Sequence, residues 1–531
     1  MNSRPDSAPH DAASYDTEFV ERLIADHAAL EQTVHSLRER LAQITQHYEW
    51  LKRQLFGRKS EKRLVGDNPD QGLLFSALPK PEAPVATEEI TYRRRRHKDR
   101  LAAVTDTGLR FGPDVPVETI EVSSPESEAI PPEHREVVGE KVSHRLARRA
   151  SYVVLKYVRL VVKDKRDEAI HTPPAPANIL DQSIVDVSFL AGMLVDKFCY
   201  HLPLYRQHQQ LQQVGITLAR ATLTQWVQRS IELLAPLYEA QLRHQLQSRV
   251  LAMDETPIRA GPSHKTKGKM HQGWYWPIYG QDDEVSFIYS PTRGAEVVKK
   301  ALGEHFKGVL LTDGYAAYRQ YAAHRPEVTA ANCWAHTRRQ FERAKDIEPG
   351  AAGEALEIIG AMYRIESEIR ERSLTGEAKL TLRQTQSAPL VAEFWRWCDR
   401  QCQRPDLVPT NPLAKALKYA LQRVEELNVF LGEPDVPIDT NHLERALRPI
   451  PMGRKNWLFC WTELGARHVG IIQSLMTTCR LHSVNPDTYL VDVLQRISQH
   501  PANKVEDLTP RVWKQTFAAN PLLSDIDRIR K

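Results

Sequence analysis

Residues 246–345 alternate between strand-like and helix-like stretches in an order that few folds accommodate. The first three predicted strands are joined as hairpins, and two later strands alternate with helices. In chain order the strands are SRVLAMD, QGWYWPIYG, EVSFIYS, GVLLTD and VTAANC, and the helices are RGAEVVKKALGEHF, GYAAYRQYA and one that starts near His336. This pattern predicts one mixed α/β sheet with helices packed on it.

The βββαβαβα order predicts a ribonuclease-H-like core, in which the first and fourth strands are neighbours. Asp254 ends the first strand and Asp313 ends the fourth, so the two carboxylates are expected to face each other at one sheet edge. Close carboxylates repel each other unless a cation holds them, and hard oxygen ligands suit Mg²⁺ or Mn²⁺. Aspartates at strand ends are also ordinary turn residues, and that interpretation is favoured for each residue taken singly.

A third carboxylate would complete a site for two metal ions, and Glu444 is the best candidate. It lies in DTNHLERALRPI, a predicted helix, at the edge of the stripe expected to be buried. That stripe consists of Leu443, Ala446, Leu447 and Ile450. The rival third ligands are Glu255, Asp439 and Glu463, and the alternative for Glu444 is an ordinary surface residue. In a two-ion site one ion activates a water or a 3′-hydroxyl and the other stabilises the leaving oxygen.

Composition excludes several other classes of protein. The 531 residues, of which 41% are hydrophobic and 26% charged, are typical of a folded protein and long enough for several domains. No apolar stretch approaches the roughly 20 residues that span a bilayer, and the N-terminus lacks the apolar core of a secretory signal. The six cysteines form no C-x-x-C pair, which fits a reducing compartment. We therefore predict a cytoplasmic protein with no membrane partner.

Residues 20–55 carry a sustained heptad repeat. Nine aliphatic residues occupy eleven core positions, with His27 and Tyr48 as the exceptions. A 3.5-residue period forms a seam for a partner helix, so we predict a coiled coil that makes a homo-oligomer. The alternative is a single amphipathic helix packed on its own domain.

The remaining segments complete the predicted organisation. Gly215 separates two helices within 181–245, a spacing that suits a helix-turn-helix but is also common in domains that never touch DNA. The predicted parts are a coiled coil with a basic extension (1–64), a linker (65–90), a small β-rich module (91–180), a helix-turn-helix-like DNA-binding segment (181–245), the first part of the core (246–345), an α-helical insertion (346–437), the second part of the core with the helix of Glu444 (438–490) and a C-terminal helical tail (491–531).

Basic residues are clustered although the net charge is only +5. Such clusters favour a polyanionic partner, the alternative being solvated surface. The candidates for contacts with DNA are Arg58, Lys59, Arg220, Lys265, Lys267, Arg338, Arg339, Arg448, Arg454 and Lys455. Cys333 and His336 form a C-x-x-H pair near the predicted site, but two further zinc ligands are missing. We interpret this pair as a buried cysteine beside a histidine, with an accessory role, and expect no zinc.

Several motifs together resemble the insertion sequence 66 family of bacterial DDE transposases. They are LKRQLFGRKSEKR after the heptads, HLPLYRQ, MDETP, LTDGYAAY, CWAHTRRQF and TNHLERALRPIPMGRKNWLF. The resemblance implies a ribonuclease-H-like catalytic domain with a helical insertion, and Asp254, Asp313 and Glu444 as its acidic triad. It also implies small accessory proteins as partners and a cysteine-rich zinc segment before the helical domain. Residues 91–170 contain no cysteine, so this chain departs from the family there.

The sequence therefore predicts a transposase that cleaves the terminal inverted repeats of an insertion element and joins the freed 3′-hydroxyl to target DNA. No serine or tyrosine nucleophile motif competes, and phosphoryl transfer of this kind needs positioning and metal charge. Two alternatives stay open. One is a nuclease or resolvase on the same fold that cuts without joining, and the other is a non-catalytic DNA-binding protein from a decayed element.

Overall fold

In a computed structural model, the structure describes residues 109–112, 115–148, 151–166, 168–181, 183–262, 269–457 and 460–529. The chain divides into two compact units, Met1–Ala86 and Thr87–Lys531. The first unit lies wholly outside the described residues, and so do the predicted coiled coil and linker, Arg58 and Lys59. Lys265 and Lys267, which follow β8 in the sequence, also lie outside them.

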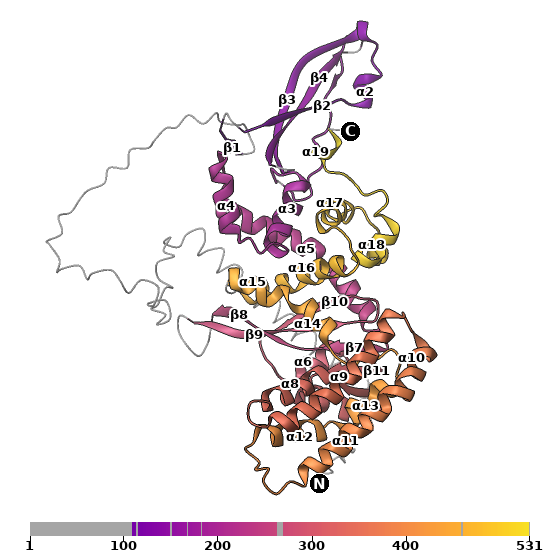
Figure 1. Cartoon of the computed structure of the whole chain (residues 1–531). Helices are drawn as coiled ribbons and strands as arrows, with labels where there is room; N and C mark the ends of the chain where they lie inside the picture. The colour runs from indigo at the N-terminus through magenta and orange to yellow at the C-terminus, as the bar shows by residue number, and fades with distance from the viewer. Residues whose placement is uncertain are drawn as a thin grey trace, which may run out of the picture. The chain divides into compact units, whose positions relative to one another are not determined.

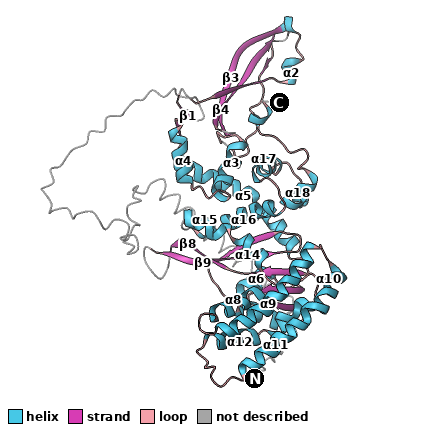
Figure 2. Ribbon diagram, viewed as in Figure 1, coloured by secondary structure: helices cyan, strands magenta, loops and turns pink. Residues whose placement is uncertain are grey.

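The described part of the second unit is a mixed α/β structure (Figure 1, Figure 2). Its central sheet has the order β10-β9-β7-β11-β12, and β8 pairs with β9. The strands are β7 (Val250–Met253), β8 (Thr256–Pro262), β9 (Met270–Tyr279), β10 (Val285–Ser290), β11 (Gly308–Thr312) and β12 (Val328–Asn332). Strands β7, β11 and β12 run parallel, while β9 pairs antiparallel with β7, β8 and β10. The prediction that the first and fourth strands are neighbours is confirmed.

One strand of this sheet differs from the sequence prediction. The sequence predicts no strand between Asp254 and QGWYWPIYG, and Pro257, Gly261 and Pro262 are poor strand formers. They form β8, which pairs with the long strand β9 and shifts register between Arg259 and Pro262. Pairing along a hairpin overrides the weak local propensity, and the core therefore begins with four strands.

Alternating side chains bury both faces of the central sheet. Leu251 and Met253 of β7 pack in the cluster that includes α6 (Ala295–Leu302) and α7 (Ala316–Ala323). Val250 and Ala252 belong to the other core cluster, with α5 (Arg220–Gln245) and α16 (Glu463–Leu481). Because helices cover both faces of the sheet, the side chains of the parallel strands are mostly buried and apolar. Polar residues are therefore expected mainly where these strands end.

A second, smaller sheet precedes the helices. It consists of β2 (Val117–Val122), β3 (Arg135–Arg148), β4 (Tyr152–Asp164) and β5 (Ile170–His171), with the order β2-β4-β3 and β5 beside β4. Tyr157 of β4 donates a 2.6 Å hydrogen bond to the carboxylate of Asp525 in α19 (Asp525–Arg528), and Ile526 packs in the same cluster as Tyr157. The last described residues of the chain therefore cover one face of this sheet.

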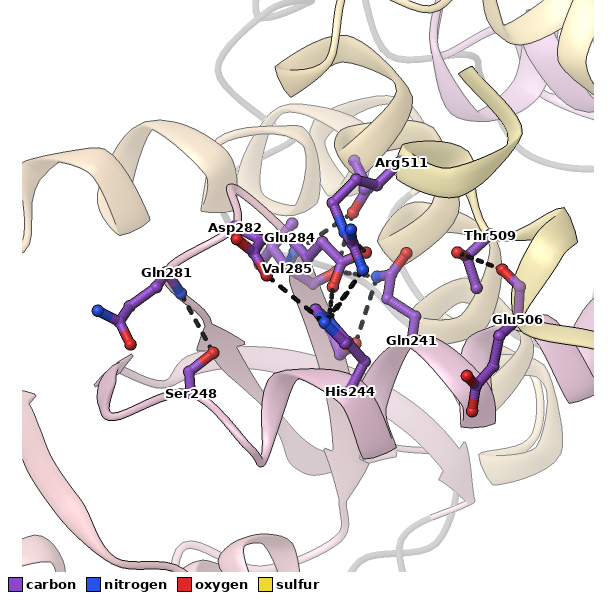
Figure 3. Close-up of polar contacts among 12 residues, drawn as sticks. Gln241, His244, Ser248, Gln281, Asp282, Glu284, Val285, Glu506, Thr509 and Arg511 are labelled. Atoms are coloured by element: carbon purple, nitrogen blue, oxygen red, sulfur yellow. Dashed lines mark hydrogen bonds and ion pairs between the residues drawn. The ribbon is translucent and has the colours of Figure 1, made fainter. Parts of the chain in front are cut away.

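Three helices link the two sheets in sequence: α3 (Val187–Phe198), α4 (Leu204–Gln213) and α5. Gly215, which has a φ of +82°, lies between α4 and α5 as the sequence predicted. At the end of α5, His244 Nδ1 lies 2.7 Å from the buried carboxylate of Glu284 in the β9–β10 turn, and Arg511 Nε donates to the same carboxylate at 3.1 Å (Figure 3). Arg511 belongs to α18 (Pro510–Thr516), so a single carboxylate joins three distant segments.

Residues between α8 (Trp334–Ala344) and α14 (Asn441–Leu447) are helical, as the sequence predicted for 346–437. They form α9 (Pro349–Glu371), α10 (Gly376–Leu382), a π-helical turn (Arg383–Ser387), α11 (Ala388–Cys402), α12 (Pro412–Leu421) and α13 (Val424–Gly432). After α14 come α15 (Pro449–Trp457), α16 and α17 (Pro486–Arg496). None of the helices in the described ranges is long and apolar enough to cross a membrane.

Candidate active site

Asp254 and Asp313 lie side by side at the carboxyl ends of two parallel strands. The paired residues of β7 and β11 are Val250 with Val309 and Ala252 with Leu311, and the same register continued by two residues pairs Asp254 with Asp313. Asp254 accepts a 2.8 Å hydrogen bond from the backbone N–H of Glu255, and Asp313 accepts one of 2.7 Å from the N–H of Tyr315. Because both strands end here, the two carboxylates reach the same edge of the sheet.

The electrostatics of Asp254 are those of an unbalanced anionic site. Burial raises the pKa of its carboxyl to about 7, and the N–H of Glu255 only partly opposes that rise. The charges of three neighbouring carboxylates, those of Glu255, Asp313 and Glu444, also raise the pKa of Asp254. Negative groups that destabilise one another in this way favour a cation between them.

Glu444 lies in the first turn of α14, and its predicted surroundings are confirmed. Leu443, Ala446, Leu447 and Ile450 are all buried, whereas the side chain of Glu444 is 32% exposed. Cys333 Sγ accepts hydrogen bonds of 3.3 Å from both the N–H and the hydroxyl of Thr440, the residue before this helix. Since Cys333 directly follows β12, it fixes the start of α14 to the end of the sheet. Burial raises the pKa of its thiol to about 11, so the sulfur stays protonated at neutral pH.

The side chain of Glu444 has basic neighbours. Its Oε1 lies 3.5 Å from an Arg339 guanidinium nitrogen and 3.6 Å from His336 Nε2. Burial, together with the charge of Arg339, lowers the pKa of His336, so Arg339 is the main counter-charge at neutral pH. Within the ranges that the structure describes, no three His, Cys, Asp or Glu side chains are grouped to hold a metal ion. Cys333 contacts Thr440 and His336 contacts Glu444, so both residues touch the segment that carries Glu444.

The donor chemistry of this edge nevertheless fits a divalent cation. Asp254 and Asp313 offer hard oxygen ligands, and the Asn332 side chain at the end of β12 is buried with no hydrogen-bond partner among the described residues. Gly314, which has a φ of +84°, lies close to this side chain, since a Cβ there would lie 2.7 Å from Asn332 Oδ1. Buried polar atoms of this kind are expected where a polar species binds.

The three rival carboxylates have other surroundings. The Glu255 side chain is only 2% exposed and accepts hydrogen bonds from Arg293 Nε at 2.9 Å and the Tyr318 hydroxyl at 2.7 Å. Asp439 accepts a 3.0 Å hydrogen bond from the N–H of Asn441 at the start of α14. Glu463 begins α16, beside Gly261.

Two residues of the helical segment, which sequence reasoning missed, hold the loop of Asp313. The Tyr419 hydroxyl donates a 2.6 Å hydrogen bond to the carbonyl of Asp313, and Arg423 donates one of 3.3 Å to the carbonyl of Gly314. Their spacing from Asp313 in the sequence, about a hundred residues, gives no signal that they meet.

Two of the predicted DNA contacts, Arg339 and Arg454, contact the segments that carry the candidate carboxylates. Arg338 and Arg339 lie on α8, and Arg448 follows α14. Arg454 of α15 donates a hydrogen bond to the carbonyl of Pro257, three residues after Asp254, and Lys455 is exposed. Arg220 lies elsewhere, exposed at the start of α5 with its guanidinium 5.6 Å from the centre of the Tyr205 ring.

Comparison with known families identifies the chain. The model of the Transposase IS66 family matches residues 182–468, which include all three carboxylates, and the model of the IS66 C-terminal element matches residues 474–511. A third model, Transposase C of IS166 homeodomain, matches residues 43–105, outside the described part. The chain belongs to the IS66 transposase family.

Three similar proteins come from Sinorhizobium fredii (strain NBRC 101917 / NGR234). Uncharacterized protein y4jD is 30% identical over 521 residues, 92% of this chain and 98% of the relative. Uncharacterized protein y4hP is 30% identical over 400 residues, 70% of each chain. Uncharacterized protein y4qI is 29% identical over 521 residues, 92% of each chain. The similarity therefore extends over nearly the whole length of two relatives.

Proposed function

We propose that this chain is a DDE transposase that cuts DNA at the ends of an insertion element and joins those ends to target DNA. The observation that carries the proposal is the parallel pairing of β7 and β11, whose register, continued past the strand ends, brings Asp254 beside Asp313 in a member of the IS66 transposase family. The strand order supports a ribonuclease-H-like core, with the helices between α8 and α14 as its insertion.

Asp254, Asp313 and Glu444 are the residues that would hold two Mg²⁺ or Mn²⁺ ions. Bound ions supply activation of the attacking oxygen and stabilisation of the leaving oxygen. For this, Asp254 must lose the proton that burial retains near pH 7. To join the same ions, the Glu444 side chain must leave Arg339 and turn toward Asp254 and Asp313. Arg339 is then available to bind a DNA phosphate.

Two displacements at phosphorus account for cutting and joining. Water attacks a phosphodiester at the end of the insertion element, the P–O bond to the 3′ oxygen breaks, and a free 3′-hydroxyl is released. That hydroxyl then attacks a phosphodiester of target DNA, and one P–O bond forms as another breaks. Arg338, Arg448, Arg454 and Lys455 are the residues proposed to supply the positive charge that positions a phosphate backbone.

The proposed partners are the terminal repeats, target DNA, a second copy of the chain through residues 20–55, and small accessory proteins of the insertion element. The proposed place of action is the cytoplasm. Sedimentation of a 1–64 peptide tests the coiled coil, and a monomer at micromolar concentration would contradict it. Zinc is not expected in residues 91–180, and metal analysis of the dialysed full chain checks that expectation.

A paired-end assay tests the proposed reaction. Full-length protein is incubated with Mg²⁺, a plasmid carrying both ends of its own insertion element, and a target plasmid, and both cut and joined products are measured. Joined products support the transposase. Cutting without joining indicates the nuclease, and binding without either indicates a decayed protein.

The same assay tests the ligand set. Asp254→Asn, Asp313→Asn and Glu444→Gln each keep the side-chain shape but remove a negative ligand, so each should abolish cutting and joining. Binding to the ends of the insertion element should persist, because it rests on Lys and Arg contacts to phosphate. A dead Asp439→Asn or Glu463→Gln beside an active Glu444→Gln would reassign the third ligand.

A further inference from the structure

Arg293 lies beside the candidate site and contacts both loops that carry Asp254 and Asp313. It precedes α6, and its side chain is 40% exposed. The guanidinium carbon lies 4.8 Å from the centre of the Trp274 ring and 4.2 Å from that of Tyr315. Two aromatic rings therefore restrict the plane and position of the cation.

On one side, Arg293 holds the residue next to Asp254. It donates from Nε and from a terminal nitrogen to Oε1 of Glu255, whose other oxygen accepts from Tyr318. The backbone N–H of that same Glu255 donates to the Asp254 carboxylate. The orientation of Asp254 thus depends on a backbone that is anchored through a buried carboxylate.

On the other side, Arg293 holds the residue that orients Asp313. Tyr315 donates its backbone N–H to the Asp313 carboxylate, and its hydroxyl donates a 3.0 Å hydrogen bond to the carbonyl of Arg293. Its ring also lies against the Arg293 guanidinium. Asp254 and Asp313 therefore each accept a hydrogen bond from a residue that Arg293 contacts.

We propose that Arg293 is a positioning residue that sets the separation of the Asp254 and Asp313 carboxylates, and thereby the affinity of the site for a divalent cation. The inference rests on the proposed function, because it takes these two residues as metal ligands. It also gives a role to Glu255, which anchors Arg293 instead of binding metal. Supports of this kind, one shell outside the ligands, typically change metal affinity by about 10- to 100-fold when they are altered.

The test is Mn²⁺ binding to full-length protein, measured by electron paramagnetic resonance, with the thermal midpoint as a measure of folding. Arg293→Lys keeps the positive charge but loses the paired donors and the planar stacking, so the dissociation constant should rise about tenfold. Arg293→Gln should also weaken binding. If Arg293 acted only as a repelling charge, Arg293→Gln would tighten binding and Arg293→Lys would leave it unchanged, and either result would overturn the proposal.

Two further variants keep the test decisive. Arg325 also lies over a tyrosine ring, 4.8 Å from the centre of Tyr321, but it contacts the carbonyl of Glu304 and neither ligand loop. Arg325→Lys should therefore bind Mn²⁺ like the wild type. Tyr315→Phe removes only the hydroxyl bridge to Arg293 and should weaken binding by about two- to threefold without unfolding the protein.

Different results would contradict the metal site and the positioning role of Arg293. Wild-type protein that binds no Mn²⁺ would contradict the proposed metal site itself. If the wild type, Arg293→Lys and Tyr315→Phe all bind Mn²⁺ with the same affinity, only the positioning role is contradicted.

Discussion

Asp164 and Asp254 both stand at the end of a β-strand, the first in the small sheet and the second in the central sheet. Arg166 follows Asp164 by two residues and donates to its carboxylate from Nε, a terminal nitrogen and the backbone N–H. These hydrogen bonds lower the pKa of Asp164 to about 2. Burial raises the pKa of Asp254 to about 7, so the same residue type in the same position has opposite electrostatics.

The difference lies in where each carboxylate finds its counter-charge. Asp164 receives it locally, from a neighbour in the sequence, and the charged form is stabilised by folding alone. Asp254 has one backbone donor and three acidic neighbours, so its charged form needs a partner from outside the chain. A carboxylate without a counter-charge in the folded chain is a candidate functional residue, whereas a carboxylate with one is more simply explained by a structural role.

The largest expected effect separates the two aspartates in the cleavage assay. Asp254→Asn should lower cleavage by at least about a thousandfold, because the site loses one of its proposed metal ligands. Asp164→Asn should stay within about threefold of wild type, since it changes only a local turn. Equal losses in both variants would remove the distinction.

Glu366 extends the comparison to a carboxylate that is buried and fully balanced. Arg383, whose side chain is 0% exposed, donates to it at 2.7 and 2.9 Å and also to three backbone carbonyls near the end of the helical segment. Arg383→Met should destabilise the protein by about 3–5 kcal/mol, because it leaves a buried carboxylate unpaired. Urea unfolding measures this, and a change below about 1 kcal/mol would contradict the role of the pair.

The stability of the two aspartate variants should change in opposite directions. Unfolded Asp254 loses its proton near pH 4 and native Asp254 near pH 7, so the native state binds more protons and stability falls as pH rises between them. In EDTA at pH 8, Asp254→Asn should therefore raise the free energy of unfolding above that of wild type by about 2–4 kcal/mol. This gain should vanish near pH 4.

The sign for Asp164 is reversed. Its lowered pKa contributes stability above about pH 4 that is lost as pH falls through about 2. Asp164→Asn should destabilise at pH 8, and the difference from wild type should shrink in acid. Unfolding curves at pH 4 and pH 8 measure both variants, and a shift of the same sign in both would refute the comparison.

The smallest effect is metal-induced stabilisation. Mn²⁺ at ten times its dissociation constant should stabilise wild type by about 1.4 kcal/mol, because it binds only the native state. Asp164→Asn should gain as much as wild type, and Asp254→Asn and Asp313→Asn should gain little. Differential scanning fluorimetry with and without Mn²⁺ measures the gain.

Some of the site could be predicted from the sequence because it depends on local pattern. The apolar runs before Asp254 and Asp313 predict buried strands, and the strand order makes these neighbours. The helical stripe around Glu444 likewise follows from a 3.6-residue period. Each of these inferences uses residues that are adjacent in the sequence or one turn of helix apart.

The rest depends on contacts that no local pattern reveals. Arg293 meets Glu255 across 38 residues, and Glu444 meets Arg339 across 105. Strand β8 escaped prediction because its partner β9, and not its own composition, stabilises it. The contacts of Arg293, Arg339 and the Tyr419 hydroxyl could therefore be identified only from the folded structure.

The hydrogen bond from Tyr419 to the carbonyl of Asp313 joins residues 106 positions apart. This separation determines how late in protein synthesis the site can be completed. A ribosome releases the chain from its N-terminus, so Asp254 and Asp313 emerge long before Tyr419 and Glu444. Until then the Asp313 loop lacks its outer support and the site lacks its third carboxylate. Under the proposed function, the nascent chain already carries the basic residues up to Arg339 and can hold DNA before it can cut it.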